Sequence, residues 1–135
     1  MPPGNGTMDA LLHMRLCMIT LTPKRLIADL SDKEYTAIAQ DRCVDGAPQG
    51  RGHLQYTNSK DNFFVGVWES TDGCWNVNYS EDEFCVILSG EAIITAADGT
   101  EFRVVDGDAF TVPAGFQGTW RTVGHVKKWY AVYDQ

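Results

Sequence analysis

The segment Gly73–Gly90 sets the strongest limit on how this chain can fold. Trp75–Tyr79 alternates and is rich in residues that favour strands, whereas Ser80–Asp82 has the composition of a turn. Phe84–Leu88 is a short apolar run that ends at a Ser-Gly pair. The pattern predicts two β-strands joined by a short acidic turn.

Glu83 is the unusual residue of this segment, because it opens an otherwise apolar strand. Alternation places its carboxylate on the same face as Cys85 and Ile87, which would point into the interior of a barrel. An ionised carboxylate in such a place is costly unless a cation or hydrogen-bond donor pairs with it. We therefore expect Glu83 to have a specific partner or a function.

Short segments with strand composition recur along the chain, separated by turn signals. The further predicted strands are His53–Tyr56, Asn62–Glu69, Glu91–Thr95, Glu101–Val105, Phe110–Val112, Thr119–Val123 and Lys127–Tyr133. Asp98-Gly99 predicts a hairpin, Asp45–Gly52 predicts a loop, and Ser31 is the expected N-cap of a brief helix that ends before Asp41. Strands at this spacing indicate an antiparallel sandwich or a small barrel.

Two glycine-bounded stretches resemble the sequence motifs of the cupin superfamily. Glu83, six residues and Gly90 are similar to the end of the first motif, which runs Gly, His-x-His, three or four residues, Glu, six residues, Gly. Gly107–Gly115 is similar to the second, which runs Gly, five residues, Pro-x-Gly, two residues, His. The resemblance extends over about Gly66–Val132 and is strongest to small single-domain cupins of the ureidoglycine-aminohydrolase-like and ethanolamine-utilisation-like branch.

This resemblance implies an all-β, single-domain cupin (RmlC-like) jelly-roll barrel with a short N-terminal extension. We expect residues 1–9 to be disordered and residues 10–135 to form the cupin domain, with the motif-bearing core at 62–133. The apolar segment Ala10–Leu21 is too short and too interrupted to cross a membrane. We expect it to cross to a partner subunit.

The metal ligands of the motif are largely missing from this chain. Asn76, Asn78 and Gly118 occupy the positions of the three histidines, and only Glu83 of the ligand set is present. Amide oxygens are weak ligands for a transition metal. We expect no metal cofactor, although a weakly bound divalent ion and a ligand from His53 stay open.

The candidate site residues follow from the alternation of the strands. Glu83 is the candidate catalytic base or ligand counter-ion, and the alternative is a structural salt bridge to Lys128 or Arg121. The expected ligand-binding set is Asn76, Asn78, Glu83, Cys85, Trp120, Lys128 and Tyr130, with Tyr79 as a further candidate. For Cys85, a small buried residue is favoured over a nucleophile, because no histidine is placed to activate it.

Charge and cysteine usage restrict the partners. A net charge of −7 and the lack of a basic stripe argue against nucleic acid and anionic membranes. The four cysteines have no C-x-x-C spacing, so we expect reduced thiols in a cytoplasmic protein. Apolar residues at Leu11–Leu21 and on the outer face of Phe84–Leu88 predict a homodimer.

Three functions are compatible with these observations. The first is an enzyme acting on a small nitrogenous or carboxylic metabolite, as the resemblance implies. The second is a non-catalytic module that binds or senses a small molecule in the same pocket. The third is metal-free isomerase or epimerase chemistry, for which the sequence offers no evident His–Asp or Tyr base pair.

Overall fold

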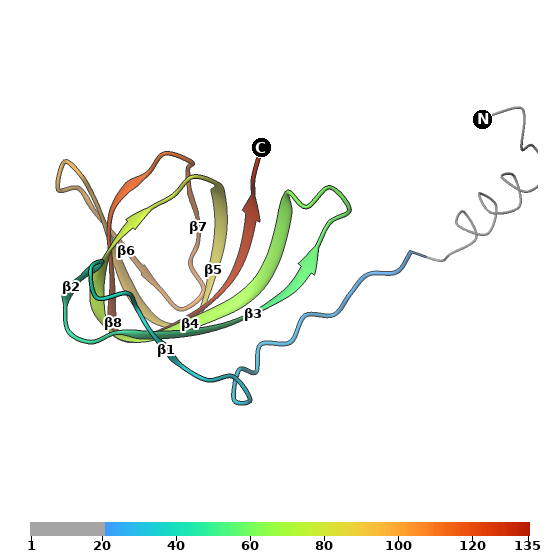
Figure 1. The fold of residues 1–135 in the computed structure, drawn as a ribbon, viewed down its shortest axis with the longest axis horizontal. Coiled ribbons are helices and arrows are strands. Elements are labelled where there is room, and N and C mark those ends of the chain that lie inside the picture. Colours follow the sequence, from blue (N-terminus) through green and yellow to red (C-terminus); the bar gives the residue numbers. More distant parts are fainter. Residues whose placement is uncertain (1–20) are drawn as a thin grey trace, which may run out of the picture.

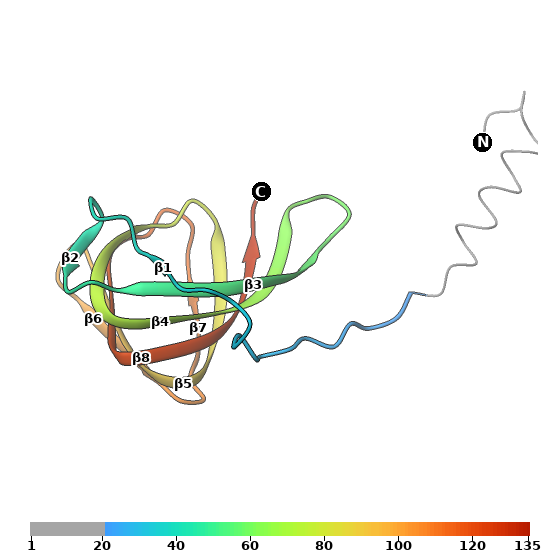
Figure 2. The same cartoon turned by 60° about the horizontal axis from the view of Figure 1, so that its bottom comes forward.

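The computed structural model describes residues 21–135, and this part of the chain contains eight β-strands and no helix. The strands are β1 (Thr36–Ala37), β2 (Cys43–Asp45), β3 (Gln49–Thr57), β4 (Phe63–Asn78), β5 (Asp82–Ala96), β6 (Glu101–Val105), β7 (Ala109–Val112) and β8 (Gln117–Tyr133). They curl into a barrel, seen from two directions in Figures 1 and 2. The predicted all-β jelly roll is confirmed. No helix in residues 21–135 is long and apolar enough to span a membrane.

All strand pairs are antiparallel and belong to one sheet with the order β1-β3-β4-β8-β5-β6. The short strand β2 pairs with β4, and β7 pairs with β5. The last strand, β8, lies between β4 and β5 over almost its whole length, so that Trp120 is flanked by Trp75 on one side and Ile94 on the other. Figure 2 shows these three strands side by side.

A β-bulge between Thr71 and Gly73 changes which side chains of β4 point inward. Trp68 faces the interior before the bulge, whereas Trp75 and Val77 face it afterwards, so that the inward positions switch from even to odd numbers. Gly73 is required there, because its φ is 149° and a side chain would collide with the ring of Pro48. The bulge therefore turns the even-numbered residues after it toward the outside.

The inner core is built on large aromatic side chains. Trp68 and Trp120 pack edge to face with a centroid distance of 6.0 Å, and Trp68 makes the same contact with Trp75. Trp120 is 2% exposed, and its indole Nε1 donates to Thr122 Oγ1 at 3.0 Å. Thr122 is in turn bonded to Ser70 Oγ at 2.5 Å, so the polar atoms of this buried region are satisfied.

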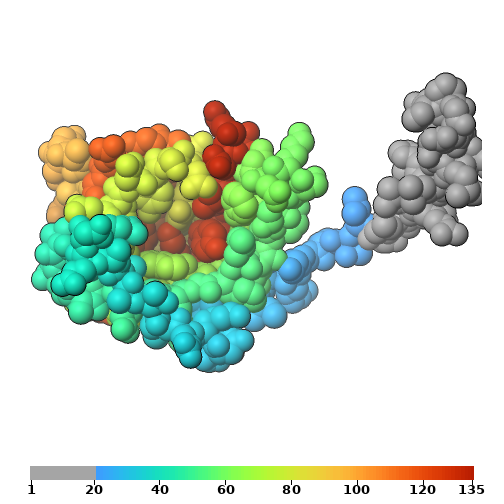
Figure 3. Space-filling model, in the orientation of Figure 1, coloured from blue at the N-terminus to red at the C-terminus, as the bar shows by residue number. Residues whose placement is uncertain are grey.

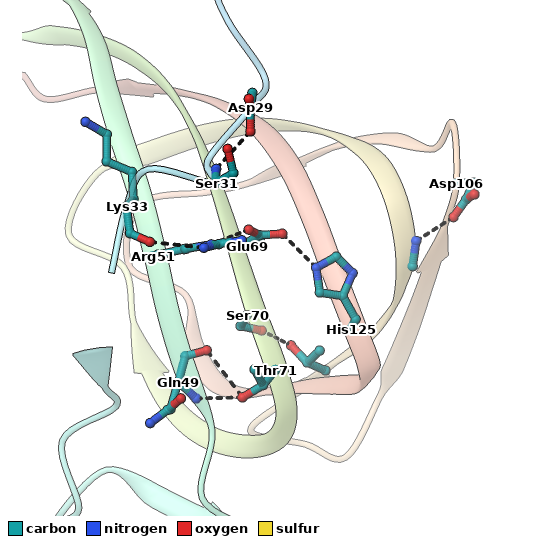
Figure 4. A network of polar contacts seen from close by, with 12 residues as sticks. Asp29, Ser31, Lys33, Gln49, Arg51, Glu69, Ser70, Thr71, Asp106 and His125 are labelled. Carbon is teal, nitrogen blue, oxygen red and sulfur yellow. Dashed lines mark hydrogen bonds and ion pairs between the residues drawn. The ribbon is translucent and has the colours of Figure 1, made fainter. Parts of the chain in front are cut away.

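Residues 24–35 form a strap across the outer face of β3 and β4. Gln55 is buried and acts as a substitute strand partner, since its side-chain amide both accepts from Ile27 N and donates to Ile27 O, each at 2.7 Å. Leu30, 1% exposed, anchors the strap by burial. Figure 4 shows the polar contacts that continue this arrangement, in which Arg51 bonds both Lys33 O and Glu69.

Two local predictions are wrong. The segment after Ser31 is a turn closed by Lys33 N donating to Leu30 O, not a helix, because burying Leu30 in the strap outweighs a weak helix signal. The predicted loop Asp45–Gly52 contains the start of β3, where Gly50 pairs with Ser70. The expectations for residues 1–9 and for most of Ala10–Leu21 fall outside the described residues.

The predicted hairpin is confirmed. Glu91 pairs with Val105 and Thr95 with Glu101, so the two strands have the expected register around Asp98-Gly99. The structure also joins predicted strands that the sequence separated. The predicted strands Asn62–Glu69 and Trp75–Tyr79, apart from their end residues Asn62 and Tyr79, lie in the single strand β4, which bends at the bulge instead of ending at Thr71-Asp72-Gly73.

Candidate functional site

A cavity of about 350 Å³ opens at one end of the barrel. Its lining residues are Ile38, Arg42, Trp68, Trp75, Val77, Asn78, Tyr79, Glu83, Trp120, Lys128, Tyr130 and Val132. Exposed Arg42 and Asn78 mark the opening, and buried Trp120 and Lys128 lie at the inner end. Figure 3 shows the hollow in this face, with atoms in the colour of β8 visible inside it.

Glu83 and Lys128 form an ion pair in the wall of the cavity. Lys128 Nζ donates to Glu83 Oε2 at 2.5 Å, and the two side chains are only 8% and 11% exposed. The adjacent strands β5 and β8 bring them together, since Ile87 pairs with Lys128 and Glu83 with Val132. The structure thus confirms that Glu83 points inward beside Lys128. The other proposed partner, Arg121, pairs with Asp45 on β2 instead.

The ammonium group of Lys128 is also held between two aromatic rings. Its Nζ lies 4.6 Å from the ring centroid of Trp120 and 5.3 Å from that of Trp68. Burial alone would lower the pKa of Lys128, but its attraction to Cys85, Glu83 and Tyr79 more than offsets this effect and raises the pKa. Lys128 is therefore charged at neutral pH, despite its burial.

Cys85 lies behind this pair and does not line the cavity. Its Sγ donates to Glu83 Oε2 at 2.7 Å and accepts from Lys128 Nζ at 3.5 Å. Burial raises the pKa of the Cys85 thiol to about 12, with a further contribution from the nearby Glu83 carboxylate. A thiol that keeps its proton at neutral pH is a poor nucleophile. Cys85 acts here as a small buried residue that donates to Glu83.

The positions of the missing motif histidines do not converge on Glu83. Asn76 follows the bulge, points outward and is exposed, so its predicted inward position is wrong. Asn78 lines the cavity only at its opening. Gly118 faces the backbone of Thr95, which leaves no room for a side chain. His53 of β3, which pairs with Val67 of β4, is not among the lining residues.

These residues do not fit the metal centre that the cupin motif implies. Glu83 Oε2, the one retained ligand atom, already accepts the Lys128 ammonium at 2.5 Å, so a second cation there would be repelled. Within residues 21–135, no group of three or more His, Cys, Asp or Glu side chains is placed to hold a metal ion. The side chain of Lys128 thus supplies the positive charge beside Glu83.

Tyr79 was only a further candidate, and six lining residues were absent from the predicted site: Ile38, Arg42, Trp68, Trp75, Val77 and Val132. Ile38 and Arg42 come from the segment before β2, where the sequence predicted a helix that ends before Asp41, and no local signal pointed to the cavity. Tyr79 comes directly after β4 and continues the inward positions of Trp75 and Val77, so correct alternation would have found it. Burial raises the pKa of the Tyr79 hydroxyl to about 12, which keeps it neutral.

A family model described as the EutQ-like cupin domain matches residues 57–130, which is more than half of the chain. The chain belongs to the EutQ-like cupin family. No curated protein matched the chain. The matched range holds Glu83, Cys85, Trp120, Lys128 and Tyr130 but not Ile38 or Arg42, so part of the cavity lining comes from outside the family's matched region.

Solved structures similar to this EutQ-like cupin show the same fold. A Pseudomonas syringae protein with unknown function has a TM-score of 0.67 at 22% identity, with 74% of this chain and 43% of that chain covered. The EutQ protein of Clostridium difficile has a TM-score of 0.58 at 16% identity, with 64% of this chain and 63% of that chain covered. A Rhizobium leguminosarum protein of unknown function has a TM-score of 0.63 at 17% identity, with 86% of this chain and 100% of that chain covered. This cupin covers less than two thirds of the length of the first two.

Proposed function

We propose that this EutQ-like cupin binds a small molecule in the barrel cavity without a metal ion. The observation that supports the proposal is the ion pair between Glu83 and Lys128 at 2.5 Å, at the place where the family motif would have a metal ligand. The pair presents a fixed donor and a fixed acceptor in a cavity of about 350 Å³ whose other walls are mainly aromatic and aliphatic. Sites of this size with a few convergent polar groups are typical of small-molecule binding.

A non-catalytic binding or sensing role explains these features with the fewest assumptions. Glu83 is engaged by both Lys128 and Cys85, and both donors hold its Oε2 atom in place. A general base must instead accept a proton from the substrate during the reaction. Tyr79 and Tyr130 have raised pKa values, mainly through burial, and serve as neutral hydrogen-bonding groups at neutral pH.

An enzymatic role is the second candidate. It is supported by the position of Glu83, which lines the cavity although its side chain is only 11% exposed. In this case Glu83 would take a proton from a bound small nitrogenous or carboxylic compound, and Lys128 would stabilise the charge that develops. Turnover of any compound that binds, abolished by Glu83→Gln with binding retained, would favour this candidate over the first.

The proposal is tested by NMR with a library of small polar compounds. Trp68, Trp75 and Trp120 all line the cavity, so their indole N–H resonances report directly on occupancy. We expect some compounds to shift these resonances equally with and without a chelator, and Val77→Trp, which fills the cavity, to abolish the shifts. Absence of any shift across the library, or shifts that require added metal, would contradict the proposal.

A further inference from the structure

We infer that the ligand of this cavity is a small organic anion, an inference that rests on the binding function proposed above. In the part of the chain that the structure describes, the charged side chains that line the cavity are Arg42, Lys128 and Glu83, two cations and one anion. The chain as a whole carries a net charge of −7. A cavity of opposite sign to the rest of the protein attracts anions selectively, because the remaining surface repels them.

The unbalanced charge belongs to Arg42. Lys128 and Glu83 satisfy each other at 2.5 Å, so their charges largely cancel within the cavity. Arginine forms three ion pairs within residues 21–135, which are Arg51–Glu69, Arg103–Glu91 and Arg121–Asp45. No carboxylate in this part of the chain pairs with Arg42. Arg42 is exposed at the opening, where an incoming anion meets it first.

The backbone of β4 fixes Arg42 in a position suited to this role. Asn76 N donates to Arg42 O at 2.8 Å, and Arg42 Nε donates back to Asn76 O at 3.3 Å. These two bonds tie both the main chain and the inner nitrogen of the side chain to one residue. The two terminal nitrogens of the guanidinium have no bond to another described residue, and two parallel N–H groups match the two oxygens of a carboxylate.

A cationic ligand is disfavoured by the same geometry. Aromatic rings bind cations through their faces, but the faces of Trp68 and Trp120 already meet the Lys128 ammonium at 5.3 Å and 4.6 Å. Among residues 21–135, Glu83 is the only carboxylate that lines the cavity, and it is likewise occupied by Lys128. A second cation would therefore meet repulsion from Lys128 and find no free counter-ion among the described residues that line the cavity.

The other walls of the cavity indicate the chemical nature of the rest of the ligand. Trp75, Val77, Tyr79 and Val132 give this part of the cavity a mainly apolar surface. An apolar or planar body replaces water there favourably, while its carboxylate stays at Arg42. The ligand class is thus a carboxylate on a short apolar or aromatic body.

Three probes of nearly equal shape test the inference: benzoate, benzamide and benzylamine. We expect benzoate to bind the purified full chain, with the neutral and cationic probes at least about tenfold weaker in a calorimetric or fluorescence titration. Arg42→Gln should weaken benzoate by about tenfold, which is the usual effect of losing a charge-assisted hydrogen bond. Arg103→Gln is the matched control, because Arg103 holds one carboxylate through Nε outside the cavity and its loss should leave binding unchanged.

The outcomes separate this inference from the proposed function. The inference of an anionic ligand is wrong if benzamide or benzylamine binds as tightly as benzoate, or if the Arg42→Gln variant binds benzoate like the unmodified chain. Either result leaves the proposed binding function intact. If no library compound shifts the indole resonances, both the proposed binding function and the inference of an anionic ligand are wrong. Benzoate affinity that falls equally in Arg42→Gln and Arg103→Gln reflects net charge only and also overturns the role of Arg42.

Discussion

Replacing Lys128 by methionine tests the central ion pair of the cavity. Methionine keeps an unbranched apolar stem between Trp68 and Trp120, so most packing contacts survive and the main loss is the positive charge. The Glu83 carboxylate, only 11% exposed, is then left without its cation. Removing one partner of a buried pair typically costs about 3–5 kcal/mol.

The cost has an upper limit, because the orphaned carboxyl group can bind a proton instead of staying ionised. Protonating a carboxyl of ordinary acidity costs about 4 kcal/mol at pH 7 and about 2 kcal/mol at pH 5.5. We therefore expect Lys128→Met to lower the free energy of unfolding by about 4 kcal/mol at pH 7 and by about half of that at pH 5.5. The sign follows because the folded variant holds a proton that the unfolded chain releases, so the variant gains stability relative to the unmodified chain as pH falls.

Denaturant unfolding monitored by tryptophan fluorescence at the two pH values measures these differences. Lys127→Met is the matched control, because Lys127 is the neighbouring lysine on the outer face of β8 and does not line the cavity. The double variant Lys128→Met with Glu83→Leu should recover most of the lost stability, since it removes both charges. A loss that is equal at pH 7 and pH 5.5, or below about 1 kcal/mol at pH 7, would refute the account of a buried, mutually dependent pair.

Four further outcomes are expected. Purified protein should contain no stoichiometric manganese, iron, nickel or zinc by elemental analysis; stoichiometric metal that disappears in Glu83→Gln would contradict this. Because the Cys85 pKa is raised to about 12, the unfolded chain releases this proton first, so stability should fall above about pH 8.5 and fall less steeply in Cys85→Ala. Burial raises the Glu69 pKa, but hydrogen bonds from His125 and Arg51 outweigh this effect and lower the pKa. The contribution of Glu69 to the stability of the fold is therefore present at pH 7 and lost below about pH 4. In Glu69→Gln, the free energy of unfolding should fall less steeply with decreasing pH in this acid range. Light scattering should give a dimer of the 15.0 kDa chain, and Phe84→Asp should dissociate it, because Phe84 is 47% exposed on the outer face. A monomer of the unmodified chain would contradict the predicted dimer.

The sequence predicted the barrel and its ion pair for one shared reason. Both depend on residues that alternate within an uninterrupted strand. Glu83, Cys85 and Ile87 keep one face over five residues without a bulge, so placing Glu83 inside also placed its neighbours correctly. The sequence left Lys128 and Arg121 open as partners of Glu83, and the structure selects Lys128.

Where the sequence failed, the cause was not local. At the bulge between Thr71 and Gly73, the register of β4 against β8 shifts by one residue, and the inward positions of β4 change from even to odd numbers. This change reverses the orientation of Asn76, Val77 and all later positions of β4. Nothing in the composition of Thr71-Asp72-Gly73 distinguishes a bulge inside a strand from a turn between two strands. Arg42 escaped prediction for a different reason, because its place at the cavity depends on hydrogen bonds to Asn76, far away in the sequence.

The position of β8 between β4 and β5 has a consequence for how the chain acquires its structure. Strands β4 and β5 cannot pair with each other in the final sheet, because the seventeen-residue strand β8 lies between them. During synthesis, β4 and β5 therefore leave the ribosome with exposed edges and must wait for the segment up to Tyr133. Pairing of distant segments is slow and leaves strands open to wrong partners. Chains shortened before Gln117 should therefore remain unfolded and prone to aggregation, whereas loss of the few residues after β8 should be tolerated.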